Sequence, residues 1–358
     1  MRLAMTLMVR DEIDIVGAML DHHLAQGVDT IIVTDNGSAD GTAELLSKYA
    51  ARGQIVLHHD PVHRKQQSEV VTAMAREAAT EFDADWVLNA DADEFWLART
   101  NGLSLHDAFE HIPRSVQAFD VHVYDLIGAP AGSGSGLQRL VYRDLRPDAI
   151  LKDIGLHAHS THDAAHVGDP AVVVAQGNHF VNIKPGDPVP AGFEIEVLHL
   201  PWRSWGQYSR KVRNAGEAYE ASPTLTPSPN HHGMRDYRRL KANTLRAYYV
   251  ARHPTPEEVE RGLVSGDFVH ETRLSAIESP QPDTALNLEI AEIEWALGRA
   301  LAAAESQLAA EHEKNRILSS GLQDMRAQNR ALDQRLQLLA NRRSVRWSDA
   351  VARRLRRG

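Results

Sequence analysis

Two aspartates and a glutamate directly follow an apolar segment in the first hundred residues. In the string WVLNADADEFW, Asp91 and Asp93 stand two residues apart and Glu94 comes next. Carboxylates at this spacing can face the same side of an extended backbone. Two hard oxygen ligands with open positions suit Mg²⁺ or Mn²⁺ that is shared with a diphosphate. The spacing therefore predicts a divalent metal site, with an ordinary acidic surface turn as the alternative.

Polar residues also follow three earlier strand-like segments. They are Arg10, Asp11 and Glu12 after the first, Asp35 and Asn36 after the second, and His63, Arg64, Lys65 and Gln67 after the third. In sheets of parallel strands the ligand site lies at the carboxyl ends of the strands. We therefore expect these groups to converge on a nucleoside diphosphate. A plain turn at 35–37 and a solvated loop at 64–65 are the alternative interpretations of single segments.

Short apolar runs alternate with helix-forming segments over the first hundred residues. The expected strands are 3–9, 30–33, 54–57 and 86–88, and the expected helices are 14–25, 38–49 and 68–80. This alternation is typical of parallel βαβ units and predicts an α/β fold. Further strand-like stretches are 116–126, 137–142, 171–175 and 194–200. Loops separate them, which indicates a mixed sheet in the second half of the same domain.

A long helical segment near the C-terminus carries a heptad pattern. The residues at its alternating a and d positions are Leu301, Ala304, Leu308, Glu311, Asn315, Leu318, Leu322, Met325, Asn329, Leu332, Leu336 and Leu339, most of them apolar. Spacings of three and four in alternation predict a coiled coil. Asn315 and Asn329 fall at a positions, which favours a parallel homodimer. The alternative is an amphipathic helix packed against the rest of its own chain.

The last eighteen residues are strongly basic although the chain as a whole is acidic. The net charge is −9, and residues 341–358 alone carry seven arginines and one aspartate. An acidic body excludes nucleic-acid binding as the main role of the chain. Val345, Trp347, Val351 and Leu355 alternate with arginines, which predicts an amphipathic helix suited to an anionic membrane surface. A basic tail without a partner is the alternative.

The chain has no cysteine, which excludes disulfides and thiolate chemistry and fits a reducing compartment. Its first residues lack the apolar core of a signal peptide, and no stretch approaches the roughly 18 apolar residues of a membrane span. We expect a cytoplasmic protein, with the tail at the inner face of the membrane.

Three strings of the sequence resemble the family 2 glycosyltransferases. The strings are MTLMVRDEIDIVGAMLDHHLAQGVDTIIVTDNGSADGTAELL, NADADEFW and VLHLPWRSWGQYSRKVRNAGEAY. The first two are similar to a bacterial subgroup in which DNGSxDGT precedes DADEF, and the third is similar to its H-x-P-x-R-S segment. The resemblance covers residues 1–220. Asp11 stands where the subgroup commonly has Asn.

The resemblance implies a GT-A fold, a mixed α/β sheet flanked by helices, that binds a UDP- or GDP-sugar with Mn²⁺ or Mg²⁺. It implies transfer to a hydroxyl acceptor such as a glycan, with inversion of the anomeric centre. Asp35 would contact the base or ribose, Asp91 and Asp93 the metal, and His199 the metal or the pyrophosphate. Arg10, Asn36, Arg64 and Gln67 complete the expected donor site, and Arg203 would stabilise the departing diphosphate.

The base that deprotonates the acceptor is not ranked by the sequence. Glu94, Asp153, Glu194 and Glu196 are all candidates. A nucleotidyltransferase is one alternative function, but the string MVRDEID after the first strand lacks the expected Gly-rich phosphate loop. An inactive sugar- or nucleotide-binding scaffold acting through its coiled coil is the other, and the intact DADE and DNGS segments count against it.

Together these patterns predict four parts of the chain. We expect a GT-A domain at 1–221, a helical extension with Pro-rich linkers at 222–284, a coiled coil at 285–340 and a basic amphipathic tail at 341–358.

Overall fold

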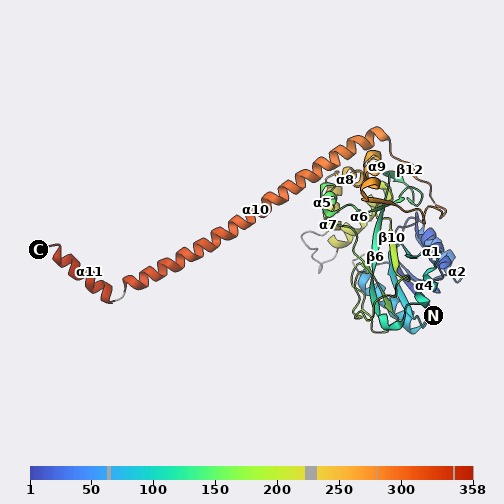
Figure 1. Ribbon diagram of the computed structural model, residues 1–358, viewed down its shortest axis with the longest axis horizontal. Helices are drawn as coiled ribbons and strands as arrows, with labels where there is room; N and C mark the ends of the chain where they lie inside the picture. The colour runs from blue at the N-terminus through green and yellow to red at the C-terminus, as the bar shows by residue number, and fades with distance from the viewer. Residues whose placement is uncertain (63–65, 222–231, 280, 342, 358) are drawn as a thin grey trace. The chain divides into compact units, whose positions relative to one another are not determined.

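The computed structural model describes residues 1–62, 66–221, 232–279, 281–341 and 343–357. The chain divides into two compact units, a globular unit (Met1–Ala302) and a C-terminal unit (Ala303–Gly358). Figure 1 shows the strands and most of the helices in the globular unit. Each unit is described by itself below.

One large mixed sheet forms the centre of the globular unit. Its strands are β1 (Leu3–Val9), β2 (Thr30–Asp35), β3 (Val56–His59), β4 (Trp86–Ala90), β5 (Glu94–Ala98), β6 (Ala118–Ile127), β8 (Tyr142–Asp144), β9 (Asp163–Val167), β10 (Ile195–His199) and β11 (Phe268–His270). Their order is β11-β8-β6-β9-β4-β1-β2-β3, and β10 pairs with β5 and β6. Strands β7 (Ala131–Ser133) and β12 (Thr284–Ala285) form a separate pair. The predicted α/β fold with a mixed sheet is confirmed.

Helices cover both faces of this sheet and extend beyond it. They are α1 (Val16–Ala25), α2 (Thr42–Ala51), α3 (Gln67–Thr80), α4 (Leu105–Glu110), α5 (Asp148–Asp153), α6 (Trp205–Glu220), α7 (His232–Lys241), α8 (Leu245–Arg252), α9 (Pro256–Ser265), α10 (Leu288–Ala340) and α11 (Arg343–Leu355). The segment predicted as a helical extension, 222–284, contains α7, α8 and α9.

Strand β1 lies in the interior of the sheet, and its side chains are therefore buried on both faces. Met5 and Leu7 pack in one core with Met19 of α1, whereas Ala4 packs in another core with Met74 of α3. A strand buried on both sides reads as a continuous apolar run, which explains the sequence LAMTLMV. Parallel pairing of β1 with β2 and β4 aligns their carboxyl ends at one edge.

Two predicted strands did not form as expected. Of 137–142 only Tyr142 lies in a strand, β8, and of 171–175 only the isolated bridge from Val174 to Val181 remains. Both segments bury apolar side chains, but their backbone groups form hydrogen bonds outside a strand ladder. Side chains of α3 supply the missing ladder bonds at the second segment, since Ser68 and Arg76 donate to the carbonyl oxygens of Val174 and Val172.

The globular unit includes the beginning of the long helix α10. Ala291 and Trp295 are buried in one core with Tyr249 of α8, and the Trp295 indole donates to the carbonyl oxygen of His253 at 2.8 Å. Helices α6, α7 and α8 contact one another in the same region (Figure 1). The compact unit therefore continues past residue 284 to Ala302, whereas the boundary expected at 221–222 adjoins residues outside the described ranges.

Replacing Gly298 with alanine is expected to lower the free energy of unfolding by about 1–3 kcal/mol. A Cβ at Gly298 would lie 2.2 Å from the carbonyl oxygen of Ala247, so α10 and α8 must separate. Gly321 on the same helix has nothing within 4 Å, and Gly321→Ala serves as the matched control. Urea unfolding monitored by tryptophan fluorescence measures both variants. Equal stability of the two variants would contradict this packing.

The C-terminal unit consists of the remainder of α10 and of α11. The predicted long helix is confirmed as one continuous element to Ala340. Seven apolar side chains of the heptad seam from Leu308 to Leu339 are 45–63% exposed: Leu308, Leu318, Leu322, Met325, Leu332, Leu336 and Leu339. Within the described residues, no helix is long and apolar enough to cross a membrane.

Candidate active site

The carboxyl ends of three parallel strands bring the predicted polar residues to one edge of the sheet. The register pairs Val9 with Asp35, and Leu7 with Ala90, which precedes Asp91. Strand β10 adds a fourth end, because His199 lies opposite Glu94 on the antiparallel strand β5. The structure thus joins residues from four segments far apart in sequence.

Asp93 lies at the centre of this edge and is 1% exposed. Its Oδ2 is 2.7 Å from Lys211 Nζ, 3.2 Å from Arg203 Nη1 and 3.7 Å from His199 Nε2. Burial opposes ionisation, but the three neighbouring cationic groups outweigh it and hold the pKa of Asp93 well below its usual range. Its other oxygen, Oδ1, is buried and has no hydrogen-bond partner among the residues that the structure describes. Asp93 is therefore an ionised carboxylate with one oxygen left for a ligand.

Arg203 was expected to stabilise the departing diphosphate, and its surroundings correct this role. The side chain is fully buried, with Nε donating to Asp14 Oδ2 at 2.9 Å and Nη2 donating to Glu12. Burial alone would lower the pKa of Arg203, but Asp14, Glu12 and Asp93 raise it. A guanidinium enclosed by three carboxylates cannot reach a ligand at the surface. Arg203 is a positioning residue that joins the segment after β1 to the loop after β4.

Glu94 lies behind Asp91 and shapes the turn that carries both aspartates. Its Oε2 accepts the backbone N–H of Asp91 at 2.8 Å. Burial and the nearby carboxylates of Asp163 and Asp91 raise the pKa of Glu94 well above its ordinary value. Because the Glu94 carboxyl group is buried and bonded to the backbone of the acidic turn, its geometry supports a positioning role in place of the expected catalytic role.

Asp91 is held by two amides from different segments. Gln67 Nε2 at the start of α3 donates to Asp91 Oδ1 at 3.0 Å, and Asn178 Nδ2 donates to the same oxygen at 3.2 Å. Burial raises the pKa of Asp91, and Lys211 acts against this shift. Asn178 is itself buried, and its Oδ1 has no partner. Gln67, which was expected in the donor site, therefore lies beside the acidic turn and contacts Asp91.

His199 connects Asp93 with a second buried aspartate. Its Nδ1 lies 2.9 Å from Asp125 Oδ1 and 3.1 Å from Ser160 Oγ, which leaves Nε2 facing Asp93. Burial would lower the pKa of His199, but Asp125 and Asp93 raise it well above its ordinary value. A metal contact by His199 would use Nε2, because Nδ1 is engaged by Asp125 and Ser160.

The segment after β2 forms a tight turn around Asp35. Both carboxylate oxygens of Asp35 accept the Ser38 N–H at 3.3 and 3.4 Å, and the side chain is buried. The Asn36 amide donates to the carbonyl oxygens of Asp60 and Val62 at 2.9 Å each. Asn36 therefore stabilises the turn, and Asp35 keeps weakly engaged oxygens at the strand end.

Arg10 crosses from β1 to this turn, where Nη1 donates to the Asn36 carbonyl oxygen at 2.6 Å. Its Nε is buried without a hydrogen-bond partner. Arg64 and Lys65, the expected cationic pair after β3, lie outside the described residues.

Three carboxylates suggested as the acceptor's base lie elsewhere or are otherwise engaged. Asp153 ends α5 with an exposed side chain, and no described hydrogen bond or ion pair links it to the strand ends. Glu194 precedes β10 and accepts the Gly192 N–H, at the opposite end of that strand. Glu196 is buried and paired with Arg143 and Arg273. Asp153 is therefore withdrawn as a catalytic residue.

Sequence reasoning missed Lys211, Asn178 and Asp163. Asp163 is fully buried, with Oδ1 3.2 Å from His179 Nδ1 and Oδ2 without a hydrogen-bond partner. Lys211 follows Arg210 on α6, where a lysine normally indicates only a solvated helix face. No local pattern points from these residues to the acidic turn, because their contacts with it are purely tertiary.

The residues at the strand ends fit a divalent cation. Asp93 offers the buried, unpartnered Oδ1, and Asp91 adds a second carboxylate. Mg²⁺ and Mn²⁺ sites of this kind take one or two protein carboxylates and complete their shell with water and phosphate oxygens. The donor set is therefore suitable for an ion shared with a diphosphate.

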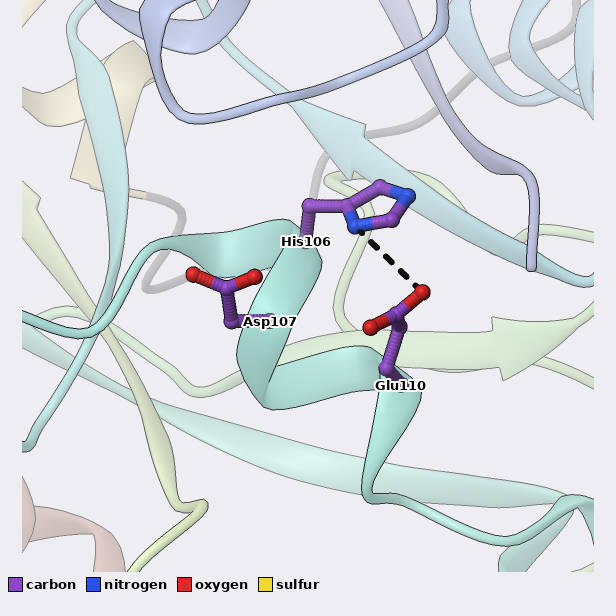
Figure 2. A group of neighbouring side chains, drawn as sticks. All are labelled: His106, Asp107 and Glu110. Atoms are coloured by element: carbon purple, nitrogen blue, oxygen red, sulfur yellow. Dashed lines mark ion pairs between the residues drawn. The ribbon is translucent and has the colours of Figure 1, made fainter.

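A second acidic group lies away from this edge. Among the described residues, the one group with three ligand atoms within 4.8 Å of one another is His106, Asp107 and Glu110 of α4. Figure 2 shows the three side chains and the 4.0 Å ion pair between His106 and Glu110. His106 also lies 3.8 Å from Asp29, which precedes β2 at the end opposite Asp35. The carboxylates are exposed, and the group has no link to the strand ends.

Comparison with known proteins indicates a class of enzyme. Residues 7–122 match the model of the glycosyl transferase family 2, a range that contains Asp35, Asp91 and Asp93. Residues 7–122 are thus similar to a family 2 glycosyltransferase domain, which agrees with the GT-A-like mixed sheet. A comparison with curated proteins gave no match.

Two solved structures illustrate the similarity of the chain to known folds. S. aureus TarS 1-349 in complex with UDP is 11% identical, with 86% of this chain and 92% of that chain covered and a TM-score of 0.32. Mycobacterium tuberculosis glucosyl-3-phosphoglycerate synthase in complex with Mn²⁺, UDP-glucose and phosphoglyceric acid is 16% identical, with 46% and 56% covered and a TM-score of 0.24.

Proposed function

We propose that this protein transfers a sugar from a UDP- or GDP-sugar to a hydroxyl acceptor, with metal assistance and inversion of the anomeric centre. The observation that carries the proposal is the buried Asp93, which follows Asp91 by two residues after the carboxyl end of β4 and whose Oδ1 has no hydrogen-bond partner among the described residues. Nucleotide ligands of open α/β sheets bind at this edge. The family 2 domain spans the same residues.

Each part of the site has a distinct role in this proposal. Asp91 and Asp93 hold the divalent cation, which supplies Lewis-acid neutralisation of the departing diphosphate. Gln67 and Asn178 fix the Asp91 carboxylate, and Arg203 fixes Asp93. Asp125 orients His199 toward the carboxylate of Asp93. This arrangement is rigid because nearly every group in it is buried, which is what positioning of a donor requires.

A thermal-shift screen tests the proposal. UDP or GDP at about 100 times its dissociation constant should raise the melting temperature by roughly 5 °C in Mn²⁺. ADP is the control for nonspecific nucleotide binding.

The product that is released distinguishes the alternative functions. A glycosyltransferase releases nucleoside diphosphate from its sugar donor. A scaffold binds without release, and a nucleotidyltransferase releases pyrophosphate from a nucleoside triphosphate.

Asp35→Asn is expected to weaken nucleotide binding about tenfold or more while changing the melting temperature little. The carboxylate lies at the end of β2, where it can accept hydrogen bonds from a base or ribose, and such charge-assisted bonds are strong. Asp29→Asn, at the opposite end of β2, is the matched control. Titration calorimetry with UDP and GDP measures both. Unchanged affinity in the Asp35 variant would make Asp35 a turn residue only.

The C-terminal unit is proposed to join two copies of the protein. The exposed seam from Leu308 to Leu339 runs along the helix at heptad spacing, and the two a-position asparagines, Asn315 and Asn329, favour a parallel pair. A parallel pair brings two copies of α11 together. Val345, Trp347, Val351 and Leu355 of α11 are exposed, and its arginines suit an anionic membrane surface.

Leu318→Glu with Leu332→Glu is expected to convert a dimer to a monomer at micromolar concentration, because both residues lie at d positions. Ser320→Glu with Gln334→Glu places the same charges at f positions and should leave the dimer intact. Light scattering gives the masses. Because each basic residue near an anionic surface contributes about 1 kcal/mol, the monomeric variant should also bind anionic liposomes more weakly.

Two results would count against this assembly. A full-length protein that is already monomeric contradicts the coiled-coil dimer, and no co-sedimentation with anionic liposomes contradicts the membrane contact. Any truncation used as a further control must keep residues up to Ala302, since Trp295 and Ala302 are buried in the globular unit.

A further inference from the structure

Three residues of helix α6 make polar contacts with residues at the strand ends. Arg210 Nη2 donates to the Asp11 carbonyl oxygen at 3.4 Å, and Asn214 Nδ2 donates to Asp11 Oδ2 at 2.9 Å. Between them Lys211 Nζ donates to Asp93 Oδ2 at 2.7 Å. The helix therefore lies along the carboxyl edge of the sheet and places one ammonium group on the central aspartate.

The two cationic side chains that contact Asp93 Oδ2 differ in how firmly other residues hold them. Arg203 is fully buried and is bound at the same time by Asp14 and Glu12. The Lys211 side chain is 41% exposed, and Asp93 is its one ion-pair partner among the described residues. A lysine ammonium sits on a flexible stem of four carbons, so it can change partners without backbone movement. Arg203 is fixed, whereas Lys211 can leave.

A divalent cation at Asp93 changes the balance of charge at this point. Asp93 already faces Lys211, Arg203 and His199, and a metal at its free Oδ1 would add two positive charges to the same carboxylate. Like charges a few ångströms apart repel strongly in a buried site. Of the three cationic side chains, Lys211 is the one with a route to solvent. A diphosphate arriving with the metal offers the ammonium a new anionic partner.

We propose that Lys211 is an exchangeable counter-ion of the donor site. It neutralises Asp93 in the free protein, yields this carboxylate to the divalent cation, and then contacts the diphosphate of the bound donor. This inference rests on the proposed function, because it requires a metal and a diphosphate at the strand ends. In this proposal Lys211 stabilises the charge of Asp93 in the free protein and binds the donor in the complex.

Manganese titration of the donor-free protein tests the first half of the exchange. Lys211→Met keeps the length of the side chain and removes its charge, and it should bind Mn²⁺ alone about tenfold more tightly than the wild type. Arg213→Met is the matched control, since Arg213 lies two residues away on the same helix and its side chain is exposed. Its Mn²⁺ affinity should be unchanged. Electron paramagnetic resonance of free Mn²⁺ gives all three affinities, and equal affinity of Lys211→Met and wild type overturns the exchange.

Binding of UDP or GDP in saturating Mn²⁺ tests the second half. Lys211→Met should bind the nucleotide at least about tenfold more weakly, although it binds the metal more tightly. These opposite shifts separate an exchange from a structural role, which would weaken both. If Lys211→Met and wild type bind the nucleotide equally, the contact with the diphosphate is wrong. If the wild type binds neither nucleotide in Mn²⁺, the proposed function fails as well.

Amine labelling of the unaltered protein gives a third readout. Release of Lys211 from Asp93 should increase its acetylation rate about threefold or more when Mn²⁺ is added without nucleotide, as measured by mass spectrometry. Lys152, exposed on α5, is the internal reference and should not change. Equal rates at Lys211 with and without Mn²⁺, at concentrations where Mn²⁺ binds, contradict the proposal.

Discussion

Replacing Arg203 with methionine is expected to lower the free energy of unfolding by about 3–5 kcal/mol. The guanidinium is fully buried between Glu12, Asp14 and Asp93, and its removal leaves three carboxylates enclosed beside one another. Breaking a buried ion pair by removing one partner costs this much because the remaining charge stays uncompensated. Chemical denaturation of the purified variant measures the loss.

The loss should be larger at pH 8 than at pH 6. Burial raises the pKa of Glu12 to about 7 even with Arg203 present. A carboxyl group whose pKa is higher in the folded state than in the unfolded state binds more protons when folded, so stability falls as pH rises through that pKa. Without Arg203 this effect should grow. Arg52→Met, an exposed site at the end of α2, should change stability by less than about 0.5 kcal/mol, and a similar small effect at Arg203 would contradict the network.

Asp93→Asn is expected to lower the rate of sugar transfer by about 10²–10³-fold or more. The substitution removes the ionised oxygen proposed to hold the metal, although an amide oxygen keeps the shape of the side chain. Lys211, Arg203 and His199 also lose their common partner, so a decrease in stability accompanies the loss. Nucleoside diphosphate release from the donor selected by the thermal-shift screen measures the rate.

Asp107→Asn is the matched control for this experiment. It alters the second acidic group, on α4, in the same chemical way (Figure 2). Its transfer rate should equal that of the wild type because α4 lies away from the strand ends. Near-full Mn²⁺-dependent activity in the Asp93 variant, or a loss in the Asp107 variant, would place the metal elsewhere.

The edge that carries the site was predictable because parallel strands have simple sequence signatures. Asp35 and Asp91 follow β-branched or apolar runs, and alternation with helices aligns the ends of those runs. The partners of these residues were not predictable in the same way. Lys211 lies 118 positions from Asp93, and its contact depends on how α6 packs. The sequence identified Arg203 as a candidate cation for the diphosphate. Only its burial shows that it binds carboxylates of the protein and does not contact a ligand.

The long helix shows a different limit of sequence reasoning. Periodicity identified α10, but it did not locate the end of the globular unit. Ala291, Trp295, Gly298 and Ala302 are buried at spacings of four, three and four, which is also the spacing of the exposed seam. These buried positions are each one residue out of step with the predicted seam, which contains Leu301, Ala304 and Leu308. The stripe that packs within the globular unit and the seam predicted for a second copy therefore lie on different faces of α10. Only the structure shows which stripe is buried at the start of the helix.

Calorimetric titration of the wild-type protein with UDP and with GDP, with Mn²⁺ and with EDTA, tests the central claim most directly. A nucleoside-diphosphate sugar site at the ends of β1, β2 and β4 predicts that one of the two nucleotides binds with one site per chain in Mn²⁺. The affinity should fall at least about tenfold in EDTA, because a metal held by Asp91 and Asp93 would neutralise the charge of the diphosphate. Absence of binding by both nucleotides in Mn²⁺ at concentrations up to about 1 mM, the upper end of ordinary substrate affinities, would contradict the account.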